Sequence, residues 1–543
     1  MNEFEIERFV LDNAVRYEGK AEIGSVVGSL IANHPELKIK IKELMPEINK
    51  IIKKVNSMSL KEQESKLKDL GELVRPEKVE RDKTPELKNP KDVVVRFAPN
   101  PNGPISLGHC RPGLWNWFLA KKYDGKYILR FDDTDPKTKV PMKEAYDWFI
   151  EDLAWLGVKP DKVVIQSSRL DVYYKYAEEL IKLGKAYVCT CDVEDKKKLL
   201  QKGVKCDCYD AYQTERWQKM FKGYKEGEAV LRIKTDLTNP NPAVRDWAAF
   251  KIVDNNKHPL NKKARVWPLL NFASAIDDHE FKVTHIIRGI DLSISDDRQK
   301  YIYKYFGWKY PETLYNGKLL VSGVKSTSIA KAMIDKGELS GWDDPRLGTI
   351  KSLRRRGFQP ETIIRFIKEV GINKNDANVS MDTLAAYNKE FIDKTTKRYF
   401  FISKPKKIKI KNAPTLDVEV PSHPDEKKLG VRKFKTGQEF YVQDKLEKGK
   451  TYRFMHLFNF VDKTYHSSEY KKELDAKLIH WLPVSENLID VEILMNDGKI
   501  TTGLAESGVN SLKVGEVIQF ERFGFCRLDK KEKIKLMFVF GHD

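Results

Sequence analysis

Residues 93–136 read VVVRFAPNPNGPISLGHCRPGLWNWFLAKKYDGKYILRFDDTDP and predict, in order, a strand, a turn, a helix, a second strand and an acidic turn. Residues 93–97 are mostly β-branched or aromatic, which is typical of a buried parallel strand. Leu114, Trp117 and Phe118 follow at the i, i+3, i+4 spacing of a helix, and residues 127–131 form the second strand. This order predicts an open α/β sheet.

Charged and polar residues gather near the carboxyl ends of these two strands. Arg96 is near the end of the first strand and Asp132 directly follows the second. The Asn102-Gly103 turn and His109 lie between them. In an open α/β sheet, ligands bind at the carboxyl ends of the strands, where a helix N-terminus attracts phosphate. Such a pocket suits a nucleotide beside a small zwitterion.

The same stretch resembles the class I glutamyl- and glutaminyl-tRNA synthetases. The family signature runs from an arginine through a P-x-P-x-G turn to the "HIGH" tetrapeptide, which here is Ser106-Leu107-Gly108-His109. The following RFDDTDP at 130–136 also matches. A bare S-L-G-H would be a weak signal, but the match extends in order over the whole of residues 93–136.

The composition favours a polyanionic partner. The 543 residues include 98 Lys and Arg against 79 Asp and Glu, a formal net charge of +19. A positive surface field steers nucleic acid, although a generally basic proteome would give the same excess.

Residues 1–8 carry three glutamates, and no apolar run is long enough for a membrane span, so neither a secretory signal nor a membrane location is expected. Six cysteines in so long a chain predict a reducing, cytoplasmic location.

Changes of pattern along the chain, together with the resemblance, predict a multidomain α/β protein. Residues 1–75 are expected to be helical, because Ile48, Ile51, Ile52 and Val55 keep helical spacing, and residues 76–92 to be a linker. The resemblance implies a Rossmann-like catalytic domain in two halves, 93–190 and 280–340. It also implies an acceptor-binding insertion at 191–279, a helical connector at 341–400 and an anticodon-binding region at 401–543.

Strand-like runs dominate after about residue 400. They lie at 439–442, 452–461, 488–495, 516–520 and 535–540, and Asn496-Asp497-Gly498 is a hairpin signal after the third run. This pattern predicts antiparallel β-barrels. Bacterial glutamyl enzymes read the anticodon with helices, whereas archaeal, eukaryotic and glutaminyl enzymes use barrels, so the resemblance is to the archaeal type.

The reaction that the resemblance implies is activation of an amino acid by ATP with Mg²⁺, followed by transfer to the 3′ end of tRNA. Catalysis would rest on positioning and on stabilising charge at phosphate oxygens. The expected ATP-binding residues of the HIGH-like turn are Asn102, Gly103, Ser106, Gly108 and His109. Ser106 replaces the first histidine of the signature, and a helix-capping role is the alternative for His109.

The second family signature, the KMSKS loop, is expected at 324–328. Its candidate catalytic residues are Lys325, Ser326, Thr327 and Ser328. Thr327 replaces the second lysine, and Ile329 stands where archaeal relatives usually have a lysine. The cation that meets the pyrophosphate is therefore left open among Lys325, Lys331 and Lys318.

Amino-acid recognition separates the two kinds of enzyme in the family. The resemblance implies that the amino acid is bound by Arg96, Asn100, Asp132, Ser274 and Arg288. Arg288 matches an arginine of glutamyl enzymes, where glutaminyl enzymes have a small neutral residue. A guanidinium binds a γ-carboxylate bidentately and would stay partly unpaired against an amide, so glutamate is favoured. The alternative for Arg288 is a surface ion pair with Asp291.

Two further groups of residues are candidates for binding. Arg354, Arg355 and Arg356 form a row in a segment that resembles the family's connector, where they would contact tRNA phosphates or lie on a solvated face. Cys189, Cys191, Cys206 and Cys208 form two C-x-C pairs. Their four thiols would hold a structural Zn²⁺ or stay reduced.

The function that the resemblance implies is ATP-dependent ligation of L-glutamate to tRNA-Glu. Glutaminyl-tRNA synthetase is the alternative within the family, and a non-catalytic tRNA-binding relative is the alternative in another functional class. Whether tRNA-Gln is also charged, with a tRNA-dependent amidotransferase acting downstream, is left open by the sequence.

Overall fold

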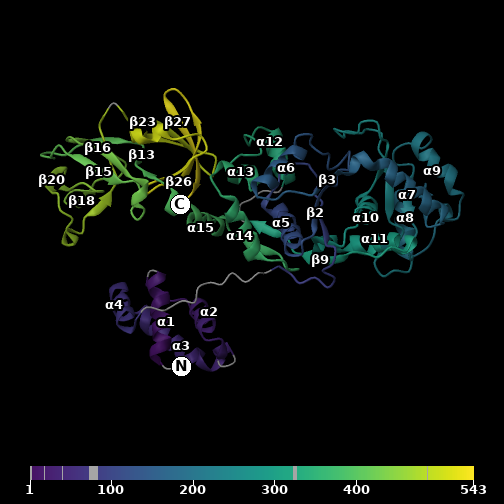
Figure 1. The fold of residues 1–543 in the computed structure, drawn as a ribbon, viewed down its shortest axis with the longest axis horizontal. Coiled ribbons are helices and arrows are strands. Elements are labelled where there is room, and N and C mark those ends of the chain that lie inside the picture. Colours follow the sequence, from purple (N-terminus) through teal and green to yellow (C-terminus); the bar gives the residue numbers. More distant parts are fainter. Residues whose placement is uncertain (1–2, 18, 39–40, 72–83, 322–326, 486) are drawn as a thin grey trace. The chain divides into compact units, whose positions relative to one another are not determined.

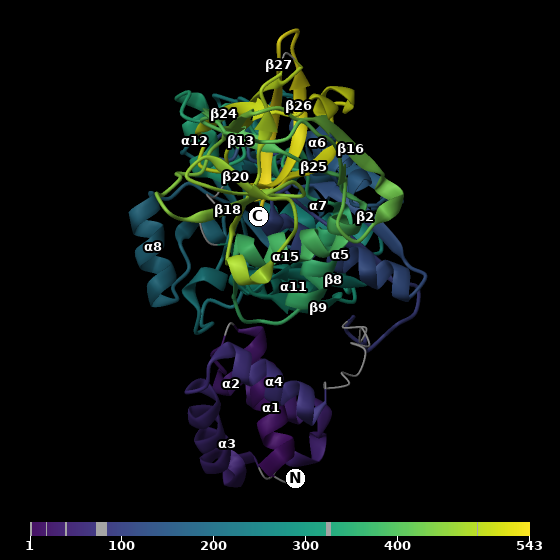
Figure 2. The same cartoon turned by 90° about the vertical axis from the view of Figure 1, so that its left-hand side faces the viewer.

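The computed structural model describes residues 3–17, 19–38, 41–71, 84–321, 327–485 and 487–543. The chain divides into two compact units, Met1–Asp82 and Lys83–Asp543, whose elements are seen from two sides in Figures 1 and 2. Lys325 and Ser326 of the predicted KMSKS loop lie outside the described residues. Among the described helices, none combines the length and the hydropathy needed to cross a membrane.

The first unit is a helical bundle. Its helices are α1 (Glu3–Arg16), α2 (Ile23–Asn33), α3 (Ile41–Asn56) and α4 (Leu60–Leu70). The core holds Phe9 and Val10 of α1 together with Ile48, Ile51, Ile52 and Val55 of α3. The predicted helical spacing therefore marks the buried face of α3, and the helical N-terminal fold is confirmed.

A five-stranded parallel sheet positions the candidate site in the second unit. Its order is β3-β2-β1-β8-β9, and its strands are β1 (Val94–Phe97), β2 (Lys126–Phe131), β3 (Lys162–Ile165), β8 (His285–Gly289) and β9 (Glu312–Asn316). α5 (Leu107–Lys122) follows β1 and α6 (Ala145–Trp155) follows β2. The strand order reverses between β1 and β8, which is the switch point at which such sheets bind ligands.

Apolar packing fixes α5 against this sheet. Val95 and Phe97 of β1 and Leu129 of β2 are buried in one cluster with Leu114 and Trp115 of α5. Burying a side chain of this size contributes about 1.5–3 kcal/mol. The cluster therefore holds the start of α5 beside the carboxyl end of β1.

A four-stranded antiparallel sheet has its first strand just before the predicted insertion at 191–279 and its other three strands within it. Its strands, in spatial order, are β4 (Ala186–Cys189), β5 (Val230–Ile233), β6 (Ala248–Ile252) and β7 (Val266–Pro268). α7 (Leu170–Lys182) precedes the predicted insertion at 191–279, and α8 (Val193–Lys202) and α9 (Gln213–Lys222) lie within it. α10 (Leu270–Glu280) then leads into β8, and α11 (Ser293–Phe306) leads towards β9.

A helical segment joins the parallel sheet to the C-terminal strands. Its helices are α12 (Thr327–Asp335), α13 (Ile350–Arg355), α14 (Pro360–Val370) and α15 (Met381–Ile392). A short parallel pair, β10 (Leu319–Val321) and β11 (Ala377–Val379), ties this segment to the chain before α12.

The C-terminal region is built of mainly antiparallel sheets. A seven-stranded sheet contains β12 (Arg398–Tyr399), β25 (Val517–Phe520), β26 (Gly524–Lys531), β27 (Lys535–His542), β23 (Ile489–Leu494), β24 (Ile500–Ala505) and β13 (Phe401–Ser403). Smaller sheets contain β14 (Lys406–Lys409), β15 (Asp417–Pro421), β16 (Val431–Lys435), β17 (Glu439–Val442), β18 (Thr451–Phe454), β19 (Asn459–Val461), β20 (Thr464–Ser467), β21 (Lys477–Ile479) and β22 (Leu482–Pro483). The predicted hairpin is confirmed, because Leu494 pairs with Ile500 across the turn.

Candidate functional site

One cavity of about 500 Å³ opens at the carboxyl ends of β1 and β8. The predicted site residues that line it are Arg96, Asn100, Asn102, His109, Asp132, Ser274, Arg288, Thr327 and Ser328. They come from β1 and the turn after it, α5, the end of β2, α10, β8 and α12. The structure thus brings the five predicted amino-acid-binding residues together with part of the predicted ATP-binding set.

The other predicted ATP-binding residues that the structure describes do not line this cavity. Gly103 lies against α12, where an added Cβ would stand 2.8 Å from Cγ2 of Thr327. Gly108 is in the first turn of α5. Lys318 is exposed and its Nζ lies 3.7 Å from Asp291, while Lys331 is on the described helix α12.

Ser106 and His109 form the N-terminal cap of α5. Oγ of Ser106 accepts the backbone N–H of His109, and Nδ1 of His109 accepts the backbone N–H of Ser106, each at 3.4 Å. This reciprocal cap leaves the proton of the neutral imidazole on Nε2. Burial of the ring lowers the pKa of His109 to about 4, so at neutral pH it is an uncharged donor. His109 therefore combines the capping role with a place in the cavity wall.

Two arginines, Arg96 and Arg130, and two aspartates, Asp132 and Asp278, form a charged network in the site. Asp278 accepts a hydrogen bond from Nε of Arg96 at 3.1 Å and another from Nη1 of Arg130 at 2.6 Å. Although burial opposes its charge, the two guanidinium groups hold the pKa of Asp278 below its usual value. Arg130 also donates to Asp132 at 2.7 Å, and Ser274 donates to the same carboxylate at 3.1 Å. Burial raises the pKa of Asp132 in spite of these partners.

Arg288 is buried and not on the surface. Its Nη1 lies 2.6 Å from Oδ1 of Asp296, and its Nη2 donates to Gln299 at 3.0 Å. The alternative surface pair with Asp291 does not form, because Asp291 faces Lys318. A buried guanidinium needs such partners, since an unpaired buried charge is strongly destabilising.

The row of three arginines serves partly as a joint to the C-terminal sheet. Arg355 donates to Asp529 of β26 at 2.7 Å, and the buried Arg356 donates to the carbonyl oxygen of Gly541 at 2.6 Å. Arg354 is the most exposed of the three and pairs with Asp152 at 3.3 Å. None of the three lines the cavity at β1 and β8.

The four predicted metal ligands lie together at the end of β4. Their Sγ atoms all lie within 4.8 Å of one another, with 3.9 Å between Cys189 and Cys206 and 3.8 Å between Cys191 and Cys208. A Zn²⁺ ion bound tetrahedrally with Zn–S bonds of about 2.3 Å requires sulfur–sulfur distances of about 3.8 Å. The donor set therefore fits zinc. Cys110 and Cys526 are buried elsewhere.

Sequence reasoning did not find Arg130, Asp278, Asp296, Gln299 or Lys139. Lys139 and Gln299 line the cavity, and the other three hold the lining residues. One signal was available for Asp278, which follows Ser274 by four residues on α10 and so shares its face.

Comparisons with known proteins identify the family of the chain. Residues 92–394 match the family described as tRNA synthetases class I (E and Q), catalytic domain. Residues 396–479 and 478–529 match two anti-codon binding domain families of the same group.

Curated relatives align over nearly the whole chain. The glutamate–tRNA ligase of Pyrococcus furiosus is 47% identical, with 98% of this chain and 98% of the relative covered. That of Methanocaldococcus jannaschii is 44% identical, again with 98% of each covered. Among solved structures, glutamate-tRNA synthetase from Elizabethkingia anophelis is 23% identical with a TM-score of 0.42, covering 56% of this chain and 71% of that chain.

Proposed function

The chain belongs to the class I tRNA synthetases of the glutamate and glutamine group, and we propose that it ligates L-glutamate to tRNA-Glu with ATP. One observation carries the choice of amino acid. Arg288 lies buried in the same cavity as Asp132, so a γ-carboxylate at the guanidinium and an α-ammonium at the aspartate satisfy both ends of glutamate.

This pair of charges disfavours glutamine. An amide offers Arg288 only one acceptor oxygen and no negative charge, so the guanidinium loses the bidentate contact that a carboxylate supplies. Leaving a buried charged group poorly paired costs about 1–3 kcal/mol, which corresponds to roughly fivefold to 150-fold in selectivity. Arg96 and Asn100 complete the predicted amino-acid site from the β1 side.

Activation joins the amino acid to ATP, which enters with Mg²⁺. A carboxylate oxygen of glutamate attacks the α-phosphorus, the bond from that phosphorus to the bridging oxygen breaks, and pyrophosphate leaves. Nε2–H of His109 is a neutral donor that can bond a phosphate oxygen, and Asn102, Thr327 and Ser328 add polar groups in the same cavity. The protein thereby contributes positioning and fixed dipoles.

The cation beside the pyrophosphate has several sources. Lys139 lines the cavity, and Lys331 belongs to the same helix as the lining residues Thr327 and Ser328. Lys325 stays a candidate outside the described residues. Lys318 is the weakest candidate, because it is paired with Asp291 away from the cavity lining.

Transfer completes the reaction. A terminal ribose hydroxyl of tRNA attacks the activated carbonyl carbon, and AMP leaves. We assign the acceptor end to the insertion at 191–279, the anticodon to the sheets after residue 400, and phosphate contact to Arg354, the most exposed of the three arginines.

The cysteine cluster would hold a structural zinc that fixes the insertion, because four protein ligands leave no open position. The six free cysteines support a cytoplasmic location.

Attachment of labelled glutamate and glutamine to tRNA-Glu and tRNA-Gln tests the proposal. Wild type should charge tRNA-Glu with glutamate only, and Arg288→Ala should lose most of that activity. Lys304→Ala, an exposed change on α11, is the matched control and should charge normally. Binding of tRNA with no charging of either amino acid would support the non-catalytic alternative. If tRNA-Gln also receives glutamate, an amidotransferase is needed downstream to convert that glutamate to glutamine. If it does not, none is needed.

A further inference from the structure

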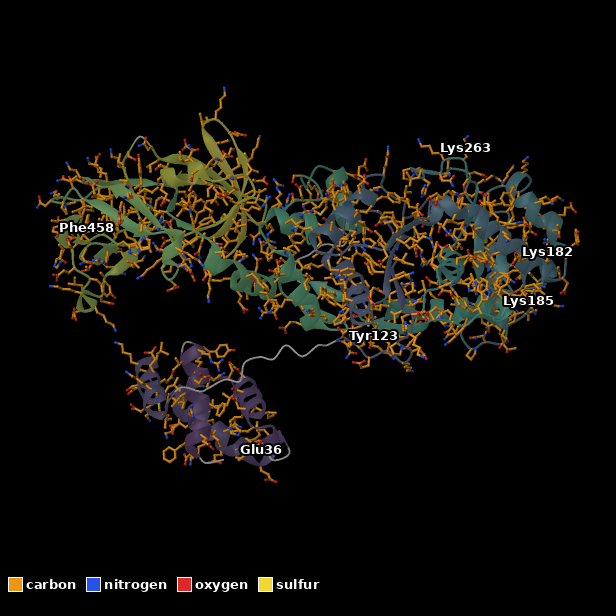
Figure 3. All side chains as sticks on the ribbon, in the orientation of Figure 1. Glu36, Tyr123, Lys182, Lys185, Lys263 and Phe458 are labelled. Atoms are coloured by element: carbon orange, nitrogen blue, oxygen red, sulfur yellow. The ribbon has the colours of Figure 1, made fainter. Side chains whose placement is uncertain are left out.

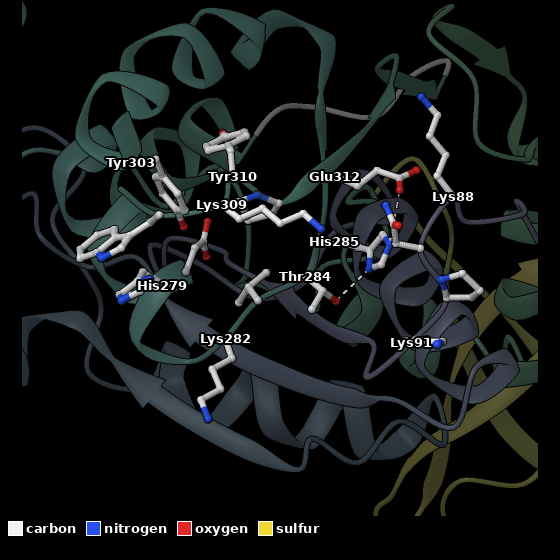
Figure 4. A pocket seen from close by; sticks show the side chains of 16 residues that line it. Lys88, Lys91, His279, Lys282, Thr284, His285, Tyr303, Lys309, Tyr310 and Glu312 are labelled. Carbon is white, nitrogen blue, oxygen red and sulfur yellow. Dashed lines mark hydrogen bonds and ion pairs between the residues drawn. The ribbon is translucent and has the colours of Figure 1, made fainter. Parts of the chain in front are cut away.

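A second cavity, of about 880 Å³, opens at the opposite edge of the parallel sheet, at the amino ends of β1, β8 and β9 (Figure 4). None of the predicted site residues lines it. α10 runs between the two cavities, so Ser274 lines the first and Asp278 the second. The second cavity is therefore separate from the glutamate site but shares a helix with it.

The lining of the second cavity is strongly positive. Lys88, Lys91, Lys282 and Lys309 line it and are exposed, and among the described residues no ion pair is seen for any of them. Of the two lining carboxylates, Asp278 is already engaged by arginines, whereas Glu312 has, in the part of the chain that the structure describes, only the neutral ring of His285 as a partner. Asp278 binds Arg96 and Arg130, and Glu312 lies 3.6 Å from Nε2 of His285. Four ammonium groups against the one unneutralised carboxylate of Glu312 leave an excess of positive charge around this cavity, which attracts a ligand with several negative charges.

The lining also narrows the chemistry of that ligand. No arginine lines the cavity, so it has no guanidinium group to bind a carboxylate bidentately. Trp308 is already stacked on His279, with ring centroids 3.5 Å apart, and on Phe306 at 4.5 Å. Its indole ring therefore has no open face for a base. Lysines acting as point charges suit phosphate groups.

A buried hydroxyl in the wall supplies an unused donor. Tyr303 lines the cavity, is only 2% exposed, and its hydroxyl has no hydrogen-bond partner among the described residues. A buried polar group without a partner calls for an explanation, and a bound ligand oxygen provides one.

We propose that this cavity binds an oligophosphate anion, held by the four lysines and by the hydroxyl of Tyr303. The phosphates come either from a free oligophosphate or from the backbone of an RNA. The proposal stands independently of the proposed function, because it uses none of the residues assigned to glutamate, ATP or zinc.

Binding of inorganic tripolyphosphate to the full chain, measured by calorimetry, tests the proposal. The variant Lys91→Ala/Lys282→Ala/Lys309→Ala should bind at least about tenfold more weakly than wild type, since it loses three phosphate contacts. The matched control is Lys143→Ala/Lys175→Ala/Lys182→Ala, which removes three exposed lysines from outside the cavity (Lys182 is labelled in Figure 3). Binding of the probe at the first cavity is common to all variants and cancels in the comparison.

Tyr303→Phe keeps the packing of the wall and should weaken tripolyphosphate binding several-fold. Titration with tRNA then separates the two sources. If an RNA backbone occupies the cavity, the cavity variant should bind tRNA more weakly than the control. Its plot of log binding constant against log salt concentration should also have a slope smaller in magnitude by about 2–3. A free oligophosphate predicts equal tRNA binding. If the cavity variant and Tyr303→Phe bind both tripolyphosphate and tRNA as the control does, the proposal is wrong.

Discussion

Arg288 and Asp296 lie side by side in the wall of the candidate site, with Nη1 of the arginine 2.6 Å from Oδ1 of the aspartate and both side chains buried. The hydroxyl groups of Tyr310 and Tyr315 donate to the same carboxylate. The guanidinium of Arg288, which we propose selects glutamate, is therefore fixed in place by the carboxylate of Asp296. Such a pair orients the guanidinium before substrate arrives, which reduces the ordering needed on binding.

Asp296→Asn should reduce the free energy of unfolding by about 3 kcal/mol, because it leaves the charge of Arg288 buried without a counter-charge. It should also raise the KM for glutamate, since the guanidinium is no longer fixed. Asp297→Asn is the control, because Asp297 is exposed and its pair with Lys300 spans 3.8 Å. That change should cost less than about 1 kcal/mol. Urea denaturation and charging kinetics measure both effects, and equal stability of the two variants would contradict the prediction.

His109→Asn should lower the charging rate about a hundredfold, because the Nε2 donor is lost. With the pKa of His109 near 4, no inflection of the wild-type pH–rate profile between about pH 6 and 8 should belong to this residue. The pKa in the folded state lies below the ordinary value of 6.5, so the stability contributed by the neutral ring is present above pH 6.5 and is lost as the pH falls towards 4. An inflection near pH 6.5 that disappears in the variant would show that the ring is charged in the working enzyme.

Local patterns predicted the elements around the site well. The apolar runs, the turn and the helical spacing in residues 93–136 predicted β1, α5 and β2. The predicted bounds of the two strands differ from the observed bounds by no more than one residue. These signals are local, because strand, helix and cap depend on neighbouring residues. The backbone conformation of the residues that end α5 was not predicted. The left-handed residue after α5 is Asp124 with φ 46°, and a glycine is needed at Gly125 because a Cβ there would stand 2.4 Å from the carbonyl oxygen of Val93.

Contacts between distant segments were not predictable in this way. Arg96 meets Asp278 across 182 residues, and Arg355 meets Asp529 across 174. No periodicity links such residues, since only the completed fold brings them together. The same limit applies to the three adjacent arginines, which looked like one phosphate clamp or one solvated face. Their side chains reach three different partners, and Arg356 is buried.

The joint made by Arg355 and Asp529 should show as an energetic coupling between the connector and β26. Arg355→Ala and Asp529→Ala should each destabilise the chain, and the double variant should be less destabilised than the sum by about 1 kcal/mol. The pair Lys407 and Glu439, 2.9 Å apart but half exposed, is the control and should couple by no more than about 0.5 kcal/mol. Denaturant unfolding of the two cycles measures the difference. Additive effects at Arg355 and Asp529 would remove their role as a joint.

The cysteine cluster should carry about one zinc ion per chain, because its four thiols have tetrahedral spacing. Cys206→Ser should lose the metal and lower the melting temperature, since metal binding contributes to folding. Cys526→Ala, at a buried cysteine outside the cluster, should keep the metal. Elemental analysis of the purified proteins decides the question. If the wild-type protein carries no metal although zinc was present in the medium, the alternative of four reduced thiols is correct.

Gly103→Ala should slow charging by displacing α12. The new Cβ would stand 2.8 Å from Cγ2 of Thr327 and 3.1 Å from the ring of Trp342, so the helix that brings Thr327 and Ser328 to the cavity must shift. A misplacement of this size at a phosphate site is expected to lower kcat at least about tenfold. The KM for glutamate should change less than kcat, because Arg96 and Arg288 lie on β1 and β8 and only Asn100 of the glutamate-binding residues belongs to the turn. Gly437→Ala is the matched control, since its Cβ would meet no heavy atom within 4 Å. If Gly103→Ala and Gly437→Ala charge tRNA at the same rate, the close approach of the turn to α12 is not what positions the phosphate-binding residues.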